Sequence, residues 1–208
     1  MSELWDDAYA LGASTRSWYQ QQAEPSLDAV GAVGAAQLQS VIAVGGGAST
    51  LVDSLLERGH ADVTILDVSE ASLHAAQARL GARADTVTWL TAALMRWHPD
   101  RTYDIWHDRA VFHFLTTAAD RQLYLRALDS ATHADSIAVV ATFAGDGPER
   151  CSGLPVAPLR GRSIAAESGP SRHGSATRRQ RDITAHGTGR PATRSECNST
   201  PRAAATGR

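Results

Sequence analysis

The chain has 208 residues with a net charge of −2, and 43% of them are hydrophobic, which is enough for one sizeable α/β domain. No apolar run approaches the length that spans a bilayer, and the acidic N-terminus lacks the basic-then-apolar pattern of a secretory signal. The two cysteines, Cys151 and Cys197, form no metal-ligand spacing and no disulfide framework. We therefore expect a cytoplasmic protein with no membrane segment and no bound metal.

The N-terminal region has a helical pattern and carries four aromatic residues, Trp5, Tyr9, Trp18 and Tyr19. We expect residues 1–39 to form a helical cap on the domain that follows. Trp18 and Tyr19 fit two roles equally well, a lid over a ligand or contacts within the core.

From residue 40 onward, short apolar runs alternate with segments of helical periodicity. The predicted strands are 41–44, 63–66, 87–90, 103–106 and 137–143. The predicted helices begin near Leu51, after the cap residue Ser69 and at Ala118, and they end at Gly59, Gly81 and Thr132. Strands that alternate with helices predict an α/β fold with a Rossmann-like, doubly wound and mainly parallel sheet over residues 40–156.

The most informative segment is Val41–Thr50, VIAVGGGAST, in which a β-branched stretch runs into three glycines and then into a predicted helix. Glycine allows a sharp turn and a close approach to a ligand, and a helix start offers unpaired N–H groups. Asp67 ends the second strand, twenty residues after Gly47, where a carboxylate usually accepts from ribose hydroxyls. These features predict a nucleoside cofactor, although the glycines also fit an ordinary turn and Asp67 a helix cap.

The glycine segment, the position of Asp67 and the run Tyr103–Leu115, YDIWHDRAVFHFL, together resemble class I S-adenosylmethionine-dependent methyltransferases. The subgroup with the strongest resemblance comprises small bacterial proteins with a WHDRAVFHFL-type segment after the fourth strand, and Ala141–Val156 also resembles them. The resemblance covers residues 1–156. It implies a Rossmann-like fold, S-adenosylmethionine as the cofactor, and methyl transfer to a nitrogen, oxygen or sulfur nucleophile.

The resemblance also implies a cofactor site at the carboxyl ends of the first three strands. The glycines would pass close to the methionine part of the cofactor, the end of the second strand would hold the ribose, and residues 91–93 would line the adenine. The implied cofactor-binding residues are Gly45, Gly46, Gly47, Asp67, Val68, Ala92 and Ala93.

The candidate catalytic residues lie after the fourth strand, where the resemblance places the methyl group and the acceptor. They are His107, Asp108 and His113. A carboxylate or an imidazole is useful there only if the acceptor must lose a proton. These side chains also fit structural roles, in which Asp108 pairs with Arg109 and His113 packs on the following helix.

The chain departs from the family pattern at three places. Ala43 stands two residues before the first glycine, where the family usually has an acidic residue, and Ala93 stands where it has an adenine-side aspartate. Residues 133–136 replace the usual proline-glycine turn before the fifth strand. Because a hydrogen bond to a charged group contributes about 1.5–3 kcal/mol, the loss of two carboxylates is expected to weaken cofactor binding.

Residues 157–208 differ from the rest of the chain, with a net charge of +7 against −9 for residues 1–156. The segment has no Phe, Trp or Tyr and three large aliphatic residues, so we expect a largely disordered tail in place of the family's last strands. A back-translation of Pro191–Ser199, shifted by one nucleotide, permits a sequence that resembles the family's penultimate strand region. We therefore hypothesise a frameshift near residue 170.

Three other interpretations stay open at this point. Ala43, Ala93 and the tail also fit a catalytically impaired methyltransferase remnant. A nucleic-acid-binding module could use the arginine-rich tail, but its charge is scattered and no aromatic residue is interleaved for stacking. A nicotinamide-dependent oxidoreductase is disfavoured by Thr50, where the dinucleotide motif has glycine or alanine. The favoured partner is a small-molecule or protein methyl acceptor, and the oligomeric state is open.

Overall fold

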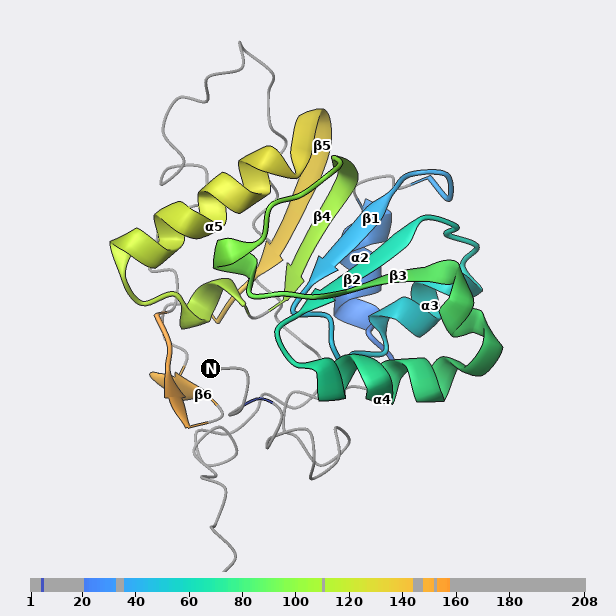
Figure 1. Ribbon diagram of the computed structural model, residues 1–208, viewed down its shortest axis with the longest axis horizontal. Helices are drawn as coiled ribbons and strands as arrows, with labels where there is room; N and C mark the ends of the chain where they lie inside the picture. The colour runs from blue at the N-terminus through green and yellow to red at the C-terminus, as the bar shows by residue number, and fades with distance from the viewer. Residues whose placement is uncertain are drawn as a thin grey trace, which may run out of the picture.

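The computed structural model describes Trp5 and residues 21–32, 36–109, 111–143, 148–151 and 153–157. A five-stranded parallel sheet with helices on both faces forms the centre (Figure 1). Its strands are β1 (Val41–Val44), β2 (Val63–Asp67), β3 (Val87–Thr91), β4 (Tyr103–Arg109) and β5 (Thr132–Ala141). The helices are α2 (Glu24–Ala32), α3 (Leu51–Glu57), α4 (Glu70–Leu80) and α5 (Ala118–Ser130).

Short elements complete the described part of the chain. Three 3₁₀ turns follow α4, β3 and β4, namely η2 (Gly81–Thr86), η3 (Leu94–Arg96) and η4 (Phe112–Phe114). Two short strands, β6 (Arg150–Cys151) and β7 (Leu154–Pro155), pair in an antiparallel ladder. The sequence pattern predicts no strand at β6 or β7, because two-residue strands leave no periodicity to detect.

The strand order β3-β2-β1-β4-β5 places β1 at the centre of the sheet, between β2 and β4. The chain moves outward from β1 to β3 and then returns to place β4 on the other side of β1. In open parallel sheets such a change of direction leaves a ligand site outside the carboxyl ends of the two strands between which it occurs, here β1 and β4. The predicted Rossmann-like, doubly wound fold is therefore confirmed, and its topology points to the segments that follow β1 and β4.

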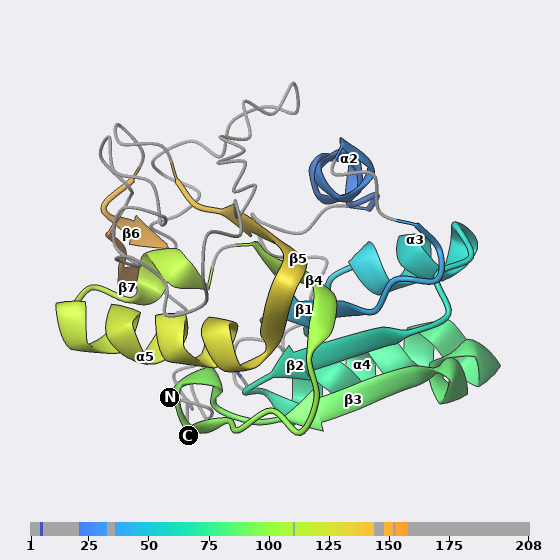
Figure 2. The ribbon, with the colours of Figure 1, turned by 90° about the horizontal axis from the view of Figure 1, so that it is seen from above.

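Helices cover both faces of the sheet, as the view from above shows (Figure 2). Alternate side chains of β1 enter two separate cores, one on each face. Val41 and Ala43 pack with buried residues of α2, α3 and α4. Ile42 and Val44 pack with Trp106 of β4 and with α5, η3 and η4. All four side chains are buried, which explains why β1 appears in the sequence as a continuous apolar run.

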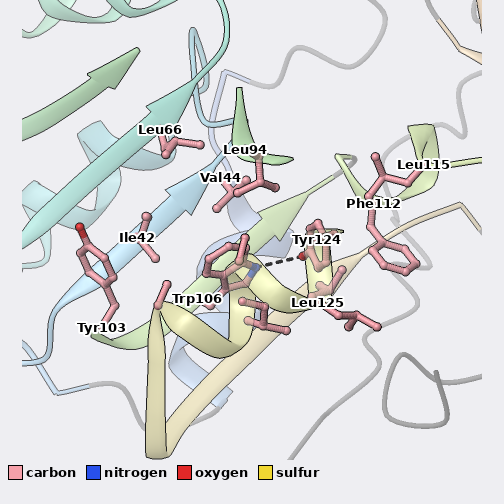
Figure 3. Packing of buried hydrophobic residues seen from close by; sticks show 14 residues of the cluster. Ile42, Val44, Leu66, Leu94, Tyr103, Trp106, Phe112, Leu115, Tyr124 and Leu125 are labelled. Carbon is pink, nitrogen blue, oxygen red and sulfur yellow. Dashed lines mark hydrogen bonds between the residues drawn. The ribbon is translucent and has the colours of Figure 1, made fainter. Parts of the chain in front are cut away.

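Trp106 and Tyr124 form the centre of the core between the sheet and α5 (Figure 3). Both are fully buried, and their rings meet edge to face with centroids 5.7 Å apart. The indole Nε1–H of Trp106 donates to the hydroxyl of Tyr124 at 3.0 Å. This bond satisfies the polar atoms that these large rings carry into the core.

The predicted helix signals around α4 are confirmed. The Ser69 hydroxyl accepts from the backbone N–H of Ser72 at 3.2 Å and caps the N-terminus. At the other end, Gly81 has a φ of 59°, a left-handed conformation that favours glycine.

The last two strands differ from their predicted bounds. β4 runs three residues past the predicted end, to Arg109, because β1 and β5 supply hydrogen bonds on both sides of it whatever its side chains are. β5 begins at Thr132 rather than 137 and ends at Ala141 rather than 143. The pairing of β5 with β4 is irregular near this start, between Tyr103 and Ile105 of β4. At this point the Ser136 hydroxyl donates to the Tyr103 carbonyl at 2.7 Å.

Several expectations fall on residues outside the described ranges. These are the roles of Trp18 and Tyr19, most of the N-terminal cap and nearly all of residues 157–208, with the frameshift hypothesis. The division at residue 156 therefore stays a prediction. Within the described ranges, the helices are too short or too polar to cross a membrane.

Shortening a core side chain is expected to destabilise the domain. Leu55 of α3 is 0% exposed, so Leu55→Ala should lower the free energy of unfolding by about 2–5 kcal/mol. The matched control is Leu38→Ala, because Leu38 is 92% exposed and its truncation should change stability by about 0.5 kcal/mol or less. Urea unfolding, with the slopes compared, measures both. Equal losses for the two variants would contradict the observed core.

Candidate active site

The three glycines turn the chain sharply at the carboxyl end of β1. Gly45 has a φ of 63°, and its N–H donates to the Leu66 carbonyl at 2.7 Å, which ties the turn to β2. A Cβ at Gly45 would also collide with the side chain of Val111, in the segment after β4. Gly45 is therefore required both by the backbone conformation and by the close approach of the β4 side.

Gly47 lies directly against Asp67. A Cβ at Gly47 would come within 2.5 Å of both Asp67 Oδ2 and the Ser72 hydroxyl. The structure thus brings the glycine bend and the carboxylate at the end of β2 together, as the sequence predicts. No side chain fits between them, which leaves backbone N–H groups close to the carboxylate.

The carboxylate of Asp67 is buried and well supplied with donors. Burial raises its pKa to about 6, against the opposing effect of hydrogen bonds from the N–H groups of Ser69, Gly47 and Val68 and from the Ser72 hydroxyl. The Ser69 N–H lies 2.9 Å from Oδ1. At neutral pH the group is ionised, and its charge is directed toward the junction of β2 with the glycine loop.

The adenine-side residues predicted from the sequence lie beside Asp67. Thr91, the last residue of β3, pairs with Asp67, and the N–H of Ala92 donates to the Asp67 carbonyl at 2.9 Å. Val68 and Ala92 are half-buried, and Ala93 is exposed. The predicted cofactor-binding residues therefore gather along one edge of the sheet, across the ends of β1, β2 and β3.

Asp108 is placed at this same edge but is fully enclosed. It pairs with Val44 across β1 and β4 and is 0% exposed. Its oxygens accept from the N–H groups of Val111 at 2.8 Å and Phe112 at 3.1 Å, and also from the hydroxyl of Tyr124. Burial raises the pKa of Asp108 to about 6, and these three donors lower it. The carboxylate holds the turn after β4 rather than facing a solvent-accessible site.

His107 and Asp108 are neighbours in β4 and so point to opposite faces of the sheet. His107 pairs with Ala43 and Val139 and is buried. Burial, with a smaller contribution from the charge of Arg109, lowers the pKa of His107 to about 4, so its imidazole is neutral at pH 7. The structure does not bring these two predicted catalytic side chains together.

His113, the third candidate, lies in an aromatic cluster beyond the end of β4. Its ring stacks on Phe143 with centroids 4.6 Å apart and meets Phe114 edge-on at 4.4 Å. Phe114 in turn meets Trp5 at 5.4 Å. His113 is 1% exposed, and within the described ranges neither of its ring nitrogens has a hydrogen-bond partner. Burial lowers its pKa to about 4. It is a neutral imidazole with an unused acceptor.

Two residues of the site were not predicted from the sequence. Ser72 contributes a hydroxyl to Asp67 from the first turn of α4, and Tyr124 contributes one to Asp108 from α5. The spacing of Ser72 after Ser69 gives a local signal, since a polar residue in the first turn of a helix faces the preceding strand end. Tyr124 gives none, because it is sixteen residues from Asp108 and looks like an ordinary core aromatic.

The fold places the described residues among the Rossmann-like domains, in which ligands bind at the carboxyl ends of parallel strands. The bend fits such a ligand, since Gly45 is exposed and Gly47 brings the backbone directly against an ionised carboxylate. A match to a protein family gives more detail than the fold alone. Residues 41–133, from β1 to the start of β5, match a family model described as a methyltransferase domain, so the resemblance to methyltransferases is confirmed over this stretch.

Solved methyltransferase structures share the fold at low sequence identity. The DhpI-SAM-HEP complex is 18% identical with a TM-score of 0.51, over 65% of this chain and 63% of that chain. A TehB-like SAM-dependent methyltransferase from Corynebacterium glutamicum is 18% identical with a TM-score of 0.50, over 66% and 68%. The CcbJ methyltransferase from Streptomyces caelestis is 13% identical with a TM-score of 0.56, over 68% and 59%.

The chain therefore spans less than two thirds of the length of DhpI and of CcbJ. No curated protein matches it significantly.

Replacing His113 with phenylalanine is expected to stabilise the protein, and more so in acid. His113→Phe removes two buried nitrogens that have no hydrogen-bond partner among the described residues. This should raise the free energy of unfolding by about 1–3 kcal/mol at pH 7. The unfolded imidazole takes up a proton below pH 6.5 but the folded one only near pH 4, so protonation favours unfolding of the wild type between these values. The advantage of the variant should therefore grow by about 3 kcal/mol as the pH falls from 6.5 to 4.

Urea unfolding at several pH values measures this difference. The control is His74→Gln, which removes an exposed imidazole from α4 and should show no comparable change with pH. A constant difference between His113→Phe and wild type over this pH range would show that His113 is not held neutral by burial.

Proposed function

We propose that the protein is an S-adenosylmethionine-dependent methyltransferase that transfers a methyl group to a nitrogen, oxygen or sulfur nucleophile. The observation that carries the proposal is the contact of Asp67 with Gly47 at the ends of β2 and β1, beside the change in strand direction. The family match over residues 41–133 and the methyltransferases that share the fold support it. DhpI is seen with SAM, which fits the proposed cofactor.

In this proposal the glycine bend and the ends of β2 and β3 hold the cofactor. Gly45, Gly46 and Gly47 offer backbone beside its methionine part, Asp67 and Val68 hold the ribose, and Ala92 and Ala93 line the adenine. The two oxygens of Asp67 can accept about four hydrogen bonds, and four donors already bind to them. A ribose hydroxyl would replace the Ser72 hydroxyl, which can donate instead to the Ser69 carbonyl 2.8 Å away.

The cofactor, when bound, supplies a methyl group made electrophilic by its sulfonium charge. The protein's task is then to align the acceptor and exclude water. Among the candidate catalytic residues, His113 is the proposed proton acceptor, because its neutral imidazole has no hydrogen-bond partner among the described residues. Asp108 would act indirectly, by fixing the backbone of Val111 and Phe112, and His107 would stay a neutral group beneath the loop on the other face.

The acceptor in this proposal is a small molecule or a protein side chain. The favoured setting is the cytoplasm, an expectation that rests on the number and spacing of the cysteines. A nucleic-acid acceptor is disfavoured by the charge of residues 1–156, which is −9.

Calorimetric titration tests the proposed cofactor. The full chain should release or take up heat with S-adenosylmethionine and with S-adenosylhomocysteine, and show none with NAD. Absence of heat and of any thermal shift with both S-adenosyl compounds would favour the remnant interpretation instead. Binding of NAD alone would favour an oxidoreductase.

Asp67→Asn should weaken binding of S-adenosylhomocysteine by about tenfold or more, because a neutral amide replaces a charged acceptor. Wild-type affinity should also fall below about pH 6, where Asp67 takes up a proton, and the variant should lack this dependence. Asp62→Asn is the matched control, since Asp62 is a half-exposed carboxylate paired with Arg101. Equal affinities for both variants, with circular dichroism of the native fold, would remove Asp67 from the cofactor site.

A further inference from the structure

The last turn of α4 carries an arginine whose side chain reaches back to the segment after the glycines. The Nη1 group of Arg79 donates to the Ala48 carbonyl at 3.2 Å, and Nη2 donates to the Ser49 carbonyl at 2.8 Å. The same guanidinium binds Asp53 of α3, with an Nε–Oδ1 distance of 3.1 Å and an Nη2–Oδ2 distance of 2.7 Å. One side chain thus joins α4 to the glycine loop and to α3, two helices on the same face of the sheet (Figure 1).

This set of contacts requires a guanidinium. Arg79 uses a planar fork of N–H groups to reach a carboxylate and two carbonyls at once, whereas a lysine ammonium is a single point charge. The side chains of Arg79 and Asp53 are 29% and 17% exposed. The pair is mostly buried and bidentate, so Asp53 fixes the guanidinium in place, and the guanidinium in turn fixes the backbone carbonyls that it contacts.

The backbone in question is the part of the loop that leads into α3. The Ser49 N–H donates to the Gly46 carbonyl at 2.9 Å, and the Ser49 hydroxyl accepts from the N–H of Leu51 at 3.2 Å. Arg79 adds bonds to the two carbonyls on this segment that point toward α4. It therefore fixes the peptide that follows Gly47 and the first residues of α3 together.

The opposite end of α4 contacts the other half of the proposed cofactor site. Its cap residue Ser69 donates its N–H to Asp67, and Ser72 in its first turn donates its hydroxyl to the same carboxylate. The 11-residue helix thus touches Asp67 at its start and the glycine loop at its end. A change at either end would alter the distance between the two groups that hold the cofactor.

We propose that Arg79 is a positioning residue for the cofactor site, holding the backbone of Ala48 and Ser49 so that the glycine loop faces Asp67. The proposal rests on the proposed function, since it assigns the loop to the cofactor. It requires that Arg79 affect cofactor affinity through the conformation of the loop, without touching the cofactor.

The test compares Arg79→Ala, Arg79→Lys and the control Arg83→Ala in the full chain. Arg83 is also an arginine near the end of α4, but it is exposed and lies 3.8 Å from Glu57. Arg79→Ala should weaken S-adenosylhomocysteine binding by about tenfold, and Arg79→Lys should stay weak because it keeps the charge but not the fork. Millimolar guanidinium chloride should restore affinity in Arg79→Ala. Arg83→Ala should bind as the wild type does.

Hydrogen exchange without cofactor completes the test. In Arg79→Ala the amides of residues 45–51 should exchange faster while those of β1, β2 and β4 keep their protection. Wild-type affinity in Arg79→Ala, or full rescue by lysine, would overturn the proposal. Faster exchange throughout the sheet would also overturn it, because Arg79 would then serve general stability. If the wild type itself fails to bind, the proposed function fails, while the exchange data still decide whether Arg79 holds the loop.

Discussion

The contact between Asp67 and the backbone at Gly47 is the constraint that shapes this edge of the sheet. The carboxylate accepts from the N–H of Gly47 as well as from Val68 and Ser69, and a single methyl group at position 47 would lie 2.5 Å from Oδ2. Gly45 is required for a separate reason, its positive φ and the approach of Val111. The bend is therefore fixed by its neighbours before any ligand arrives, and such preorganisation lowers the entropic cost of binding.

Four buried ionisable groups surround this edge, and their effects on stability oppose one another. Burial raises the pKa values of Asp67 and Asp108 to about 6, so their ionisation disfavours the folded state as the pH rises from about 4 to 6. Burial lowers the pKa values of His107 and His113 to about 4, so the folded state gains as the pH rises from 4 to 6.5. Backbone N–H groups donate to both carboxylates, whereas neither ring nitrogen of the buried His113 has a hydrogen-bond partner among the described residues.

Local patterns were enough to predict the first three strands, the Ser69 cap, the Gly81 stop and the nearness of Asp67 to the glycines. Each of these depends on residues close in sequence or on the fixed topology of a parallel sheet. The predicted end of β4 was wrong because His107, Asp108 and Arg109 interrupt the apolar run, while the backbone of β4 continues to pair with its neighbouring strands. Contacts between distant segments, such as the one between Tyr124 and Asp108, cannot be predicted from local patterns. No nearby residue distinguishes a tyrosine that donates to a carboxylate from one that only packs in the core.

Ala43 illustrates how a departure from the family pattern changes its surroundings. It lies 1% exposed in the middle of β1, paired with Ile65 on one side and with His107 on the other. A carboxylate there would stand beside the imidazole and favour its protonated form. With alanine in its place, burial and the charge of Arg109 lower the pKa of His107, and no carboxylate among the described residues opposes them. Ala43 and a neutral His107 are therefore consistent with each other, and the polar contacts of the loop come from its own backbone, from Asp67 and from Arg79.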